Sequence, residues 1–218
     1  AALDQAMEEN QRIFLVAQRD MDVDDPCIDD IYHVGTIASV KQVLRLPGDN
    51  VRLLVEGKSR AVLRAVTQEE PYFVGALDEV LEQGTPVSIE TDALLRTAHH
   101  YFEEYCKTSG RISGETMQSV LEIEDPGQLA DIIAANVLSK IEDRQQVLEE
   151  FDELARLEAV CALLVRETEL AGVEKKVQAR VRKQIEQNQK DYFLREQIKA
   201  IQTELGDKDA TDVEDLRE

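Results

Sequence analysis

The chain has 218 residues, of which 43% are hydrophobic and 32% are charged, so it can build one large domain or two small ones. Its 45 acidic residues outnumber its 25 basic residues and give a formal net charge of -20. This charge argues against nucleic acid or an anionic membrane as a partner, because phosphate groups are bound by clustered lysine and arginine. No apolar run approaches the ~20 residues that cross a bilayer.

The cysteines and the first residues of the chain bear on its location and origin. Cys27, Cys106 and Cys161 lie far apart, which predicts reduced thiols in a cytoplasmic protein rather than a disulfide framework or a zinc site. Residues 1–5 lack the basic and apolar regions of a signal peptide. They also lack an initiator methionine and already have a helical pattern, so we expect the chain to begin partway into a longer protein.

Residues 1–83 predict a β-rich subdomain after a short opening helix. The composition of residues 47–50 predicts a hairpin turn, and Gly57 predicts a further turn or a bulge. Short strands joined at this spacing predict a small antiparallel barrel or sandwich. The segments with apolar or alternating patterns are 13–17, 32–40, 41–46, 51–55, 60–66 and 72–81.

Residues 84–151 predict a helical bundle, because the apolar period changes there from two to about 3.6. Gly110 should end the first helix of the bundle, and Ser113 should open the next. Asp125 and Pro126 predict another helix start, since Asp is favoured at the N-cap and Pro in the first turn. The apolar stripe of the first helix comprises Ile89, Leu94, Leu95, Ala98, Phe102 and Tyr105.

Residues 152–205 predict one very long helix, followed by an acidic linker at residues 206–218. Its apolar residues recur with an eleven-residue period, which keeps the stripe on one side of a straight helix. A single narrow stripe predicts a strut that is covered along one side only. We take its first part as a candidate assembly face, made of Val173, Val177, Val181 and Ile185.

The charge of residues 173–205 differs from that of the rest, with eight Lys and Arg against five Asp and Glu. One interpretation is a basic surface that meets an acidic partner or nucleic acid. The favoured interpretation is a solvated helix face with pairs such as Glu186 and Lys190 at the i,i+4 spacing.

Two segments resemble a nucleotide-binding loop and a metal-binding loop, but both motifs are incomplete. Residues 57–59 resemble the end of a P-loop, but Arg52 stands where the first glycine of the phosphate loop is required. Residues 20–31 begin like a calcium loop. Asp25 replaces its required glycine and Ile31 its bidentate glutamate, which favours a solvated acidic loop.

Two side-chain pairs also fall short of a catalytic site. His99 and His100 have carboxylates one turn away, but a metal or acid–base site needs a third convergent group. Ser139 and Lys140 are neighbours in the sequence, which is the wrong geometry for a Ser–Lys pair. We therefore expect a binding or structural module, with no catalytic residue, metal or cofactor of its own.

Four segments, taken in order, resemble the Lon ATP-dependent proteases and together span most of the chain. The most specific is QKDYFLREQIKAIQTELG at residues 189–206, which resembles the Q-(R/K)-E-Y-(Y/F)-L-R-E-Q stretch of that family. It departs mildly at Thr203, where the family often has Lys. The others are FLVAQ at 14–18 continuing to YHVGTIA at 32–38, LRLPG at 44–48 with VRLLVEG at 51–57, and DPGQLADIIA at 125–134.

The resemblance implies an α+β fold with a small antiparallel β-barrel similar to the PUA domain, a helical bundle and a long C-terminal helix. The opening strand of the family is expected upstream of residue 1, so the barrel should lack its first strand. The AAA+ module with its ATP and Mg²⁺, and the protease domain with its Ser–Lys dyad, are expected beyond residue 218. None of the family's catalytic motifs falls within this chain.

For this region the resemblance implies substrate recognition and oligomerisation in a hexameric serine protease that degrades misfolded and regulatory proteins. We expect contacts with unfolded or damaged proteins at Leu44, Leu46 and Val51. The alternative is that these three side chains belong to the barrel core. Neither a membrane nor nucleic acid is expected as a partner. The alternative function is a standalone binding scaffold of the same N-terminal fold with no attached protease.

Overall fold

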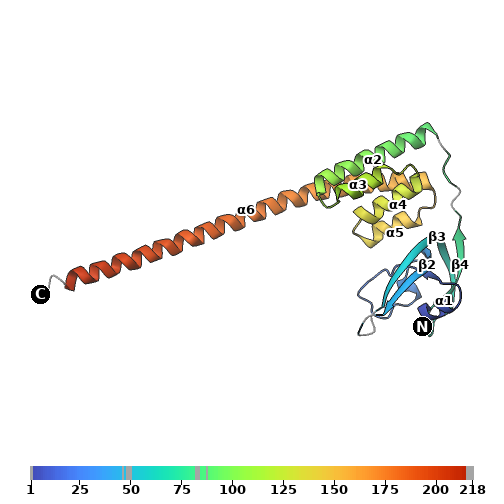
Figure 1. Ribbon diagram of the computed structural model, residues 1–218, viewed down its shortest axis with the longest axis horizontal. Helices are drawn as coiled ribbons and strands as arrows, with labels where there is room; N and C mark the ends of the chain where they lie inside the picture. The colour runs from blue at the N-terminus through green and yellow to red at the C-terminus, as the bar shows by residue number, and fades with distance from the viewer. Residues whose placement is uncertain (1, 46, 48–50, 82–83, 87, 215–218) are drawn as a thin grey trace. The chain divides into compact units, whose positions relative to one another are not determined.

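The computed structural model describes residues 2–45, 47, 51–81, 84–86 and 88–214 (Figure 1). The chain divides into two compact units, Ala1–Thr168 and Glu169–Glu218, so the first unit contains both the predicted β-rich subdomain and the predicted helical bundle. The strands are β1 (Arg12–Leu15), β2 (Val34–Arg45), β3 (Val51–Gln68) and β4 (Val74–Val80). The helices are α1 (Ala2–Glu8), the 3-10 helix η1 (Ile28–Asp30), α2 (Ile89–Ser109), α3 (Gly114–Leu121), α4 (Pro126–Val137), α5 (Ile141–Glu149) and α6 (Glu153–Glu214). The predicted α+β class, with strands first and helices after, is confirmed.

The four strands form one antiparallel sheet in the order β1-β2-β3-β4. The predicted segments 32–40 and 41–46 are joined in the single strand β2, and 51–55 and 60–66 in the single strand β3. Arg45 of β2 pairs with Val51 of β3 at the end of this long hairpin. Of the predicted turn, residues 48–50 lie outside the described residues.

Two irregularities interrupt the pairing of β2 with β3. The register shifts between Ile37 and Ala38 and again between Val40 and Gln42. The residues left without a pairing partner are Lys58 in β3 and Lys41 in β2, which makes each of them a bulge residue. Where a turn or bulge was predicted at Gly57, the structure has a bulge at the next residue, Lys58, and Gly57 pairs with Ala38.

The predicted helix boundaries in the bundle are confirmed by their caps. Asp125 Oδ1 accepts a hydrogen bond of 2.6 Å from the backbone N–H of Gln128, and Pro126 occupies the first turn of α4. Ser113 caps α3 in the same way. Gly110 ends α2 with φ of 64°, in the left-handed region that glycine adopts without strain.

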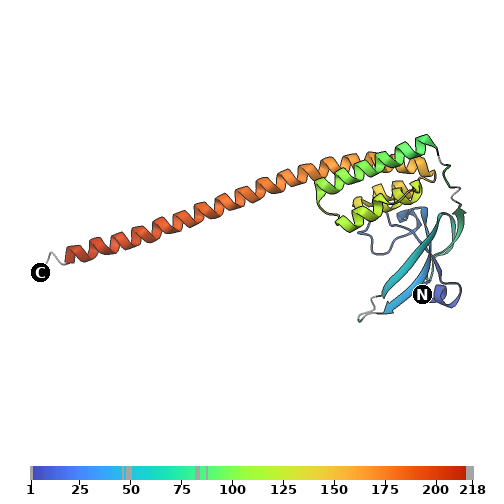
Figure 2. The same cartoon turned by 45° about the horizontal axis from the view of Figure 1, so that its top comes forward.

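Helix α5 joins the sheet to the other helices. In both ribbon views α5 lies next to the sheet, and it contacts β2 on one side and α4 on the other (Figures 1 and 2). Gln145 of α5 is buried, and its Nε2 donates a hydrogen bond of 3.0 Å to the carbonyl oxygen of Val34.

The predicted apolar stripe of α2 is wrong at Ile89, which is 91% exposed because it lies at the solvated first turn of the helix. The largest buried apolar side chains of the helices and their connections are Phe102, Leu129, Ile133, Leu138, Leu157 and Leu164.

The last helix, α6, has 62 residues, Glu153–Glu214. Gly206, expected to end it, lies inside it. A single glycine in a helix interior costs only about 1 kcal/mol relative to alanine, too little to end so long a helix by itself. None of the helices that the structure describes is long and apolar enough to span a membrane.

Candidate functional site

The hairpin end of β2 and β3 carries a cluster of exposed apolar side chains. We call residues 42–45 and 51–54 the β2–β3 arm. Leu44 is 45% exposed and Val51 is 48% exposed, so these two predicted contact residues are not part of a core. Leu46, the third, lies outside the described residues. The sequence did not single out Leu53 and Leu54, which are exposed beside them.

Both faces of the arm are apolar. Leu44 pairs with Arg52, and Gln42 pairs with Leu54 two residues further along each strand, so Leu44 and Leu54 share a face. Residues directly opposite each other in a sheet share a face, and successive residues alternate between faces. Leu53 and Val51 therefore lie on the other face. An exposed strand pair with leucine on both faces cannot bury them within its own sheet, so it is a natural binding surface for apolar chain segments.

Basic side chains lie at the root of the arm and at its hairpin end. The Nζ atoms of Lys41 and Lys58 lie 2.8 and 2.6 Å from Oε2 of Glu56, which ties the two bulge residues to one carboxylate. The hydrogen bonds and charge of Lys41 and then Lys58 lower the pKa of Glu56 to about 2. Arg45 forms a further ion pair of 2.8 Å with Asp4 of α1. The arm is thus a locally basic element in an acidic chain.

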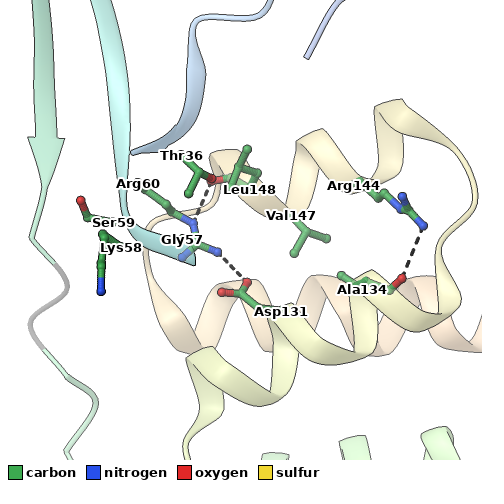
Figure 3. Close-up of a pocket in the computed structure, with 11 residues that line it drawn as sticks. Thr36, Gly57, Lys58, Ser59, Arg60, Asp131, Ala134, Arg144, Val147 and Leu148 are labelled. Atoms are coloured by element: carbon green, nitrogen blue, oxygen red, sulfur yellow. Dashed lines mark hydrogen bonds and ion pairs between the residues drawn. The ribbon is translucent and has the colours of Figure 1, made fainter. Parts of the chain in front are cut away.

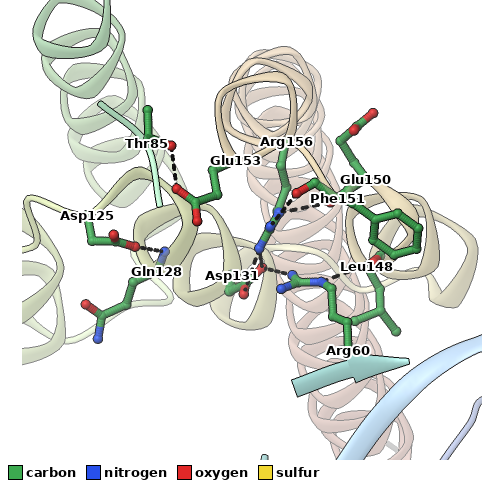
Figure 4. A network of polar contacts seen from close by, with 10 residues as sticks. All are labelled: Arg60, Thr85, Asp125, Gln128, Asp131, Leu148, Glu150, Phe151, Glu153 and Arg156. Carbon is green, nitrogen blue, oxygen red and sulfur yellow. Dashed lines mark hydrogen bonds and ion pairs between the residues drawn. The ribbon is translucent and has the colours of Figure 1, made fainter. Parts of the chain in front are cut away.

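A second group of polar side chains joins the sheet to the helices (Figure 4). Asp131 of α4 accepts a hydrogen bond of 2.5 Å from Nη2 of Arg60, which lies on β3. The same carboxylate accepts two hydrogen bonds of 3.2 Å from Nη1 of Arg156 on α6. The side chain of Arg156 is fully buried and that of Arg60 is 9% exposed, whereas Asp131 is 42% exposed. One carboxylate therefore forms ion pairs with two buried guanidinium groups. Buried charged groups need such a partner, because burying an unpaired charge is costly.

The two arginines also bind the carbonyl oxygens of the α5–α6 connection. Arg60 Nε donates to Leu148 at 3.2 Å, and Arg156 Nε donates to Glu150 at 3.0 Å. Sequence reasoning missed this cluster. The available signal was Arg156 itself, a charged residue within the apolar stretch that opens α6.

A cleft of about 520 Å³ opens beside this cluster, between β2 and β3 on one side and α4 and α5 on the other (Figure 3). Its wall includes Lys58, Arg60, Asp131 and Arg144. Arg144 donates to the carbonyl oxygens of Leu138 at 2.7 Å and Ala135 at 3.4 Å. The cleft has charged side chains among apolar ones and is open to solvent.

The predicted stripe of α6 lies along one exposed side of that helix. Val173, Val177, Val181 and Ile185 are each between 48% and 55% exposed. The last three line a shallow apolar hollow of about 440 Å³. Within the second unit, this stripe has no described core to cover it. Contact of this stripe with a partner stays a prediction.

The described residues contain no group of three or more His, Cys, Asp or Glu side chains that could hold a metal ion. Cys106 and Cys161 are buried, and burial raises the pKa of both thiols, that of Cys161 to about 11. Cys27 is exposed. His99 contributes to the wall of another hollow, and its Nε2 is buried with no hydrogen-bond partner among the described residues.

Comparison with known proteins gives one consistent result. The chain is 43% identical over 212 residues to the Lon protease of Clostridioides difficile, covering 95% of this chain and 27% of the relative. It is 43% identical over 207 residues to the Lon protease of Escherichia coli, covering 95% of this chain and 26% of the relative. The chain thus spans about a quarter of the length of the curated relatives that it matches.

Solved structures and a family model agree with these relatives. The N-terminal domain of the Mycobacterium avium complex Lon protease superposes with a TM-score of 0.57 at 25% identity, covering 78% of this chain and 83% of that one. A Lon N-terminal domain protein from Xanthomonas campestris, 12% identical with a TM-score of 0.51, shares the fold over 73% of this chain and 79% of that one. The family model for the substrate-binding domain of ATP-dependent protease La (LON) matches residues 1–166. The chain therefore belongs to the Lon substrate-binding domain family.

Proposed function

We propose that this chain captures unfolded client proteins through the β2–β3 arm, for an ATP-dependent Lon protease of which it forms the N-terminal region. The observation that carries the proposal is the exposure of leucine on both faces of the arm, in a family named for substrate binding. The alignment with full Lon proteases includes the long helix and reaches 99–100% of this chain. That coverage favours a region of a protease over a standalone scaffold.

The physical basis of capture is burial of apolar surface. An unfolded client exposes side chains that a folded protein buries, and each Å² of apolar surface removed from water contributes about 25 cal/mol. Leu44 and Leu54 on one face, and Val51 and Leu53 on the other, offer such surface without catalytic groups. Arg45 and Arg52 beside them keep the free arm solvated. Binding without chemistry suits a region that hands its client to another module.

Hydrolysis is assigned to the rest of the parent protein. We propose that ATP, Mg²⁺ and a Ser–Lys dyad act in its other modules, in the cytoplasm, and that this region contributes no catalytic group. The proposed role of the stripe of α6, Val173 to Ile185, is contact with neighbouring subunits of a hexamer. Its half-exposed valines support this role, because two such stripes bury each other when helices pack side by side.

Client capture is tested with the double variant Leu44→Asp, Leu54→Asp, which places two charges on one face of the arm. We expect the affinity for a reduced and alkylated, permanently unfolded protein to fall at least about tenfold, the equivalent of 1.4 kcal/mol. The control is Leu81→Asp, which makes the same chemical change at a leucine that is 81% exposed and lies outside the arm. Equal affinity of the arm variant and the control would contradict the proposal.

Assembly is tested in the parent protein with Val181→Asp. Burying one unpaired charge in a helix–helix contact costs several kcal/mol, so we expect smaller oligomers on gel filtration. The control is Ala179→Asp, an exposed residue two positions earlier and therefore on nearly the opposite side of α6. Hexamers of unchanged size in Val181→Asp would remove the stripe from the assembly surface.

A further inference from the structure

The apolar stripe of α6 is bordered by basic side chains without an ion-pair partner. Residues 173–185 contain five Lys and Arg against one Glu. Lys176 and Arg180 follow Val173 and Val177 at the i,i+3 spacing, so they lie directly beside the stripe. Both are exposed, and neither makes an ion pair with a residue that the structure describes. The stripe is therefore an apolar surface with free positive charge along its margin.

This charge pattern opposes the packing of two α6 stripes on each other. The basic segment and the apolar stripe occupy the same stretch of the helix. Two copies that buried stripe against stripe would therefore bring their cations to the margins of one contact, in either relative direction. Like charges in that position repel. The surface that complements the stripe has apolar groups and carboxylates side by side.

The first unit carries a surface of this kind around Met21. Four of residues 20–25 are aspartates, all exposed, and none of the four makes an ion pair with a described residue. Met21 is 74% exposed and lines, with Ile141 and Leu148, an apolar hollow of about 440 Å³. Arg144 also contributes to the wall, so four negative charges stand near one positive charge. We call residues 20–25 and this hollow the Met21 surface.

We propose that the α6 stripe of one copy of this chain binds the Met21 surface of a second copy. The inference rests on the proposed assembly role of the stripe and names the surface of the neighbouring subunit that the stripe contacts. Lys176 and Arg180 pair with the aspartates, while the valines of the stripe cover the hollow. Each copy has one surface of each kind, so the contact is heterologous. Such contacts continue from copy to copy and close into a ring, as the proposed hexamer requires.

The first test is self-association of the whole chain, measured by sedimentation velocity at low salt. We expect association that rises with concentration and weakens at raised salt, because salt screens exposed charges. Lys176→Glu should weaken it about fivefold, the equivalent of about 1 kcal/mol. A chain that stays monomeric up to about 1 mM would overturn the inference.

The matched control is Lys190→Glu, the same change at another exposed lysine of α6. Residue 190 follows Ala179 by eleven residues, so it lies on the side of the helix opposite the stripe. Melting temperatures report whether each variant is folded. Equal weakening by Lys176→Glu and Lys190→Glu would overturn the inference, because the stripe side would then have no special role.

A charge exchange identifies the second surface of the contact. Asp22→Lys should weaken association as Lys176→Glu does. The chain that carries both changes should associate as the unchanged chain does, because the two charges have exchanged places. An equimolar mixture of the two single variants should recover in the same way. If the chain with both changes stays as weak as the single variants, or if it recovers and the mixture does not, the inference is overturned.

The inference and the proposed assembly role fail in different ways. If α6 stripes pack on each other, Asp22→Lys leaves association unchanged while Val181→Asp abolishes it. That result overturns the inference and leaves the assembly role intact. If Val181→Asp changes neither the association of this chain nor the size of the parent hexamer, the assembly role is wrong as well.

Discussion

Arg60 Nη2 lies 2.5 Å from Oδ1 of Asp131, and 71 residues separate the two in the sequence. This bond links the third strand to the fourth helix. Because the same carboxylate also binds Arg156, the sheet, α4 and the start of α6 meet at one side chain. The stability of the first unit therefore depends on Asp131, because this side chain joins three elements and not only α4.

We predict that Asp131→Asn destabilises the first unit by about 2–3 kcal/mol. Removing one partner of a buried ion pair costs about 3–5 kcal/mol, and the cost here is smaller because Asp131 is 42% exposed. Chemical denaturation measures the loss. Glu104→Gln is the control, since it also removes one negative charge, from an exposed side of α2. A loss no larger than that of the control would show that the two arginines do not need Asp131.

The two bulge lysines give Glu56 a distinctive titration. Its pKa of about 2 lies below the ordinary value of 4.5, so the folded state favours the ionised form. The contribution of Glu56 to stability is then fully present above about pH 4.5 and is lost as the pH falls toward 2. Carboxyl carbon chemical shifts followed by NMR should show Glu56 ionised where exposed glutamates are half protonated. In the variant Lys41→Met, Lys58→Met its pKa should return toward 4.5.

The three cysteines should differ in reactivity. Thiolate is the reacting form, and burial raises the pKa of Cys161 to about 11 and that of Cys106 above its ordinary value. At pH 8, iodoacetamide should therefore modify Cys27 first, and mass spectrometry identifies the site. Denaturant should make all three react at similar rates. Early modification of Cys161 in the folded chain would contradict its buried position.

Two glycines of the sheet should respond differently to alanine. A Cβ at Gly35 would lie 2.3 Å from the carbonyl oxygen of Leu15, so β1 and β2 would have to separate. A Cβ at Gly57 would meet only Thr36 Cγ2, at 3.4 Å. We predict a loss of about 1–3 kcal/mol for Gly35→Ala, typical of overpacking, and less than about 0.5 kcal/mol for Gly57→Ala. Equal losses would contradict the close approach at Gly35.

Local patterns in the sequence predicted much of the fold because caps and turns are local. Asp125 and Pro126 marked the start of α4, and Gly110 marked the end of α2, since each acts on backbone groups within four residues of itself. Ile89 was misplaced because its periodicity matched the stripe although the helix begins there in solvent. Gly206 was misread because its conformational cost is small.

The parts of the site that depend on distant residues could not be predicted in the same way. The bonds that join Arg60 and Arg156 to Asp131 span 71 and 25 residues, and a single sequence leaves no periodic trace of them. Leu44 and Val51 were found as candidates, but only the strand pairing revealed that they lie on opposite faces. The cleft combines β2, β3, α4 and α5, so no single segment of the sequence contained it.

The two bulges of the long hairpin compensate for each other. The two residue numbers of each β2–β3 pair add up to 96 for residues 34–37 of β2 and to 95 for residues 38–40. In the arm they add up to 96 again. One extra residue on β3, Lys58, is thus balanced by one on β2, Lys41. Because each lysine is the unpaired extra residue of its bulge, deleting either one removes that bulge and leaves every other pair of the hairpin, including the pairs of the arm, able to form. The two lysines therefore control the bend and twist of the hairpin and not the pairing within the arm.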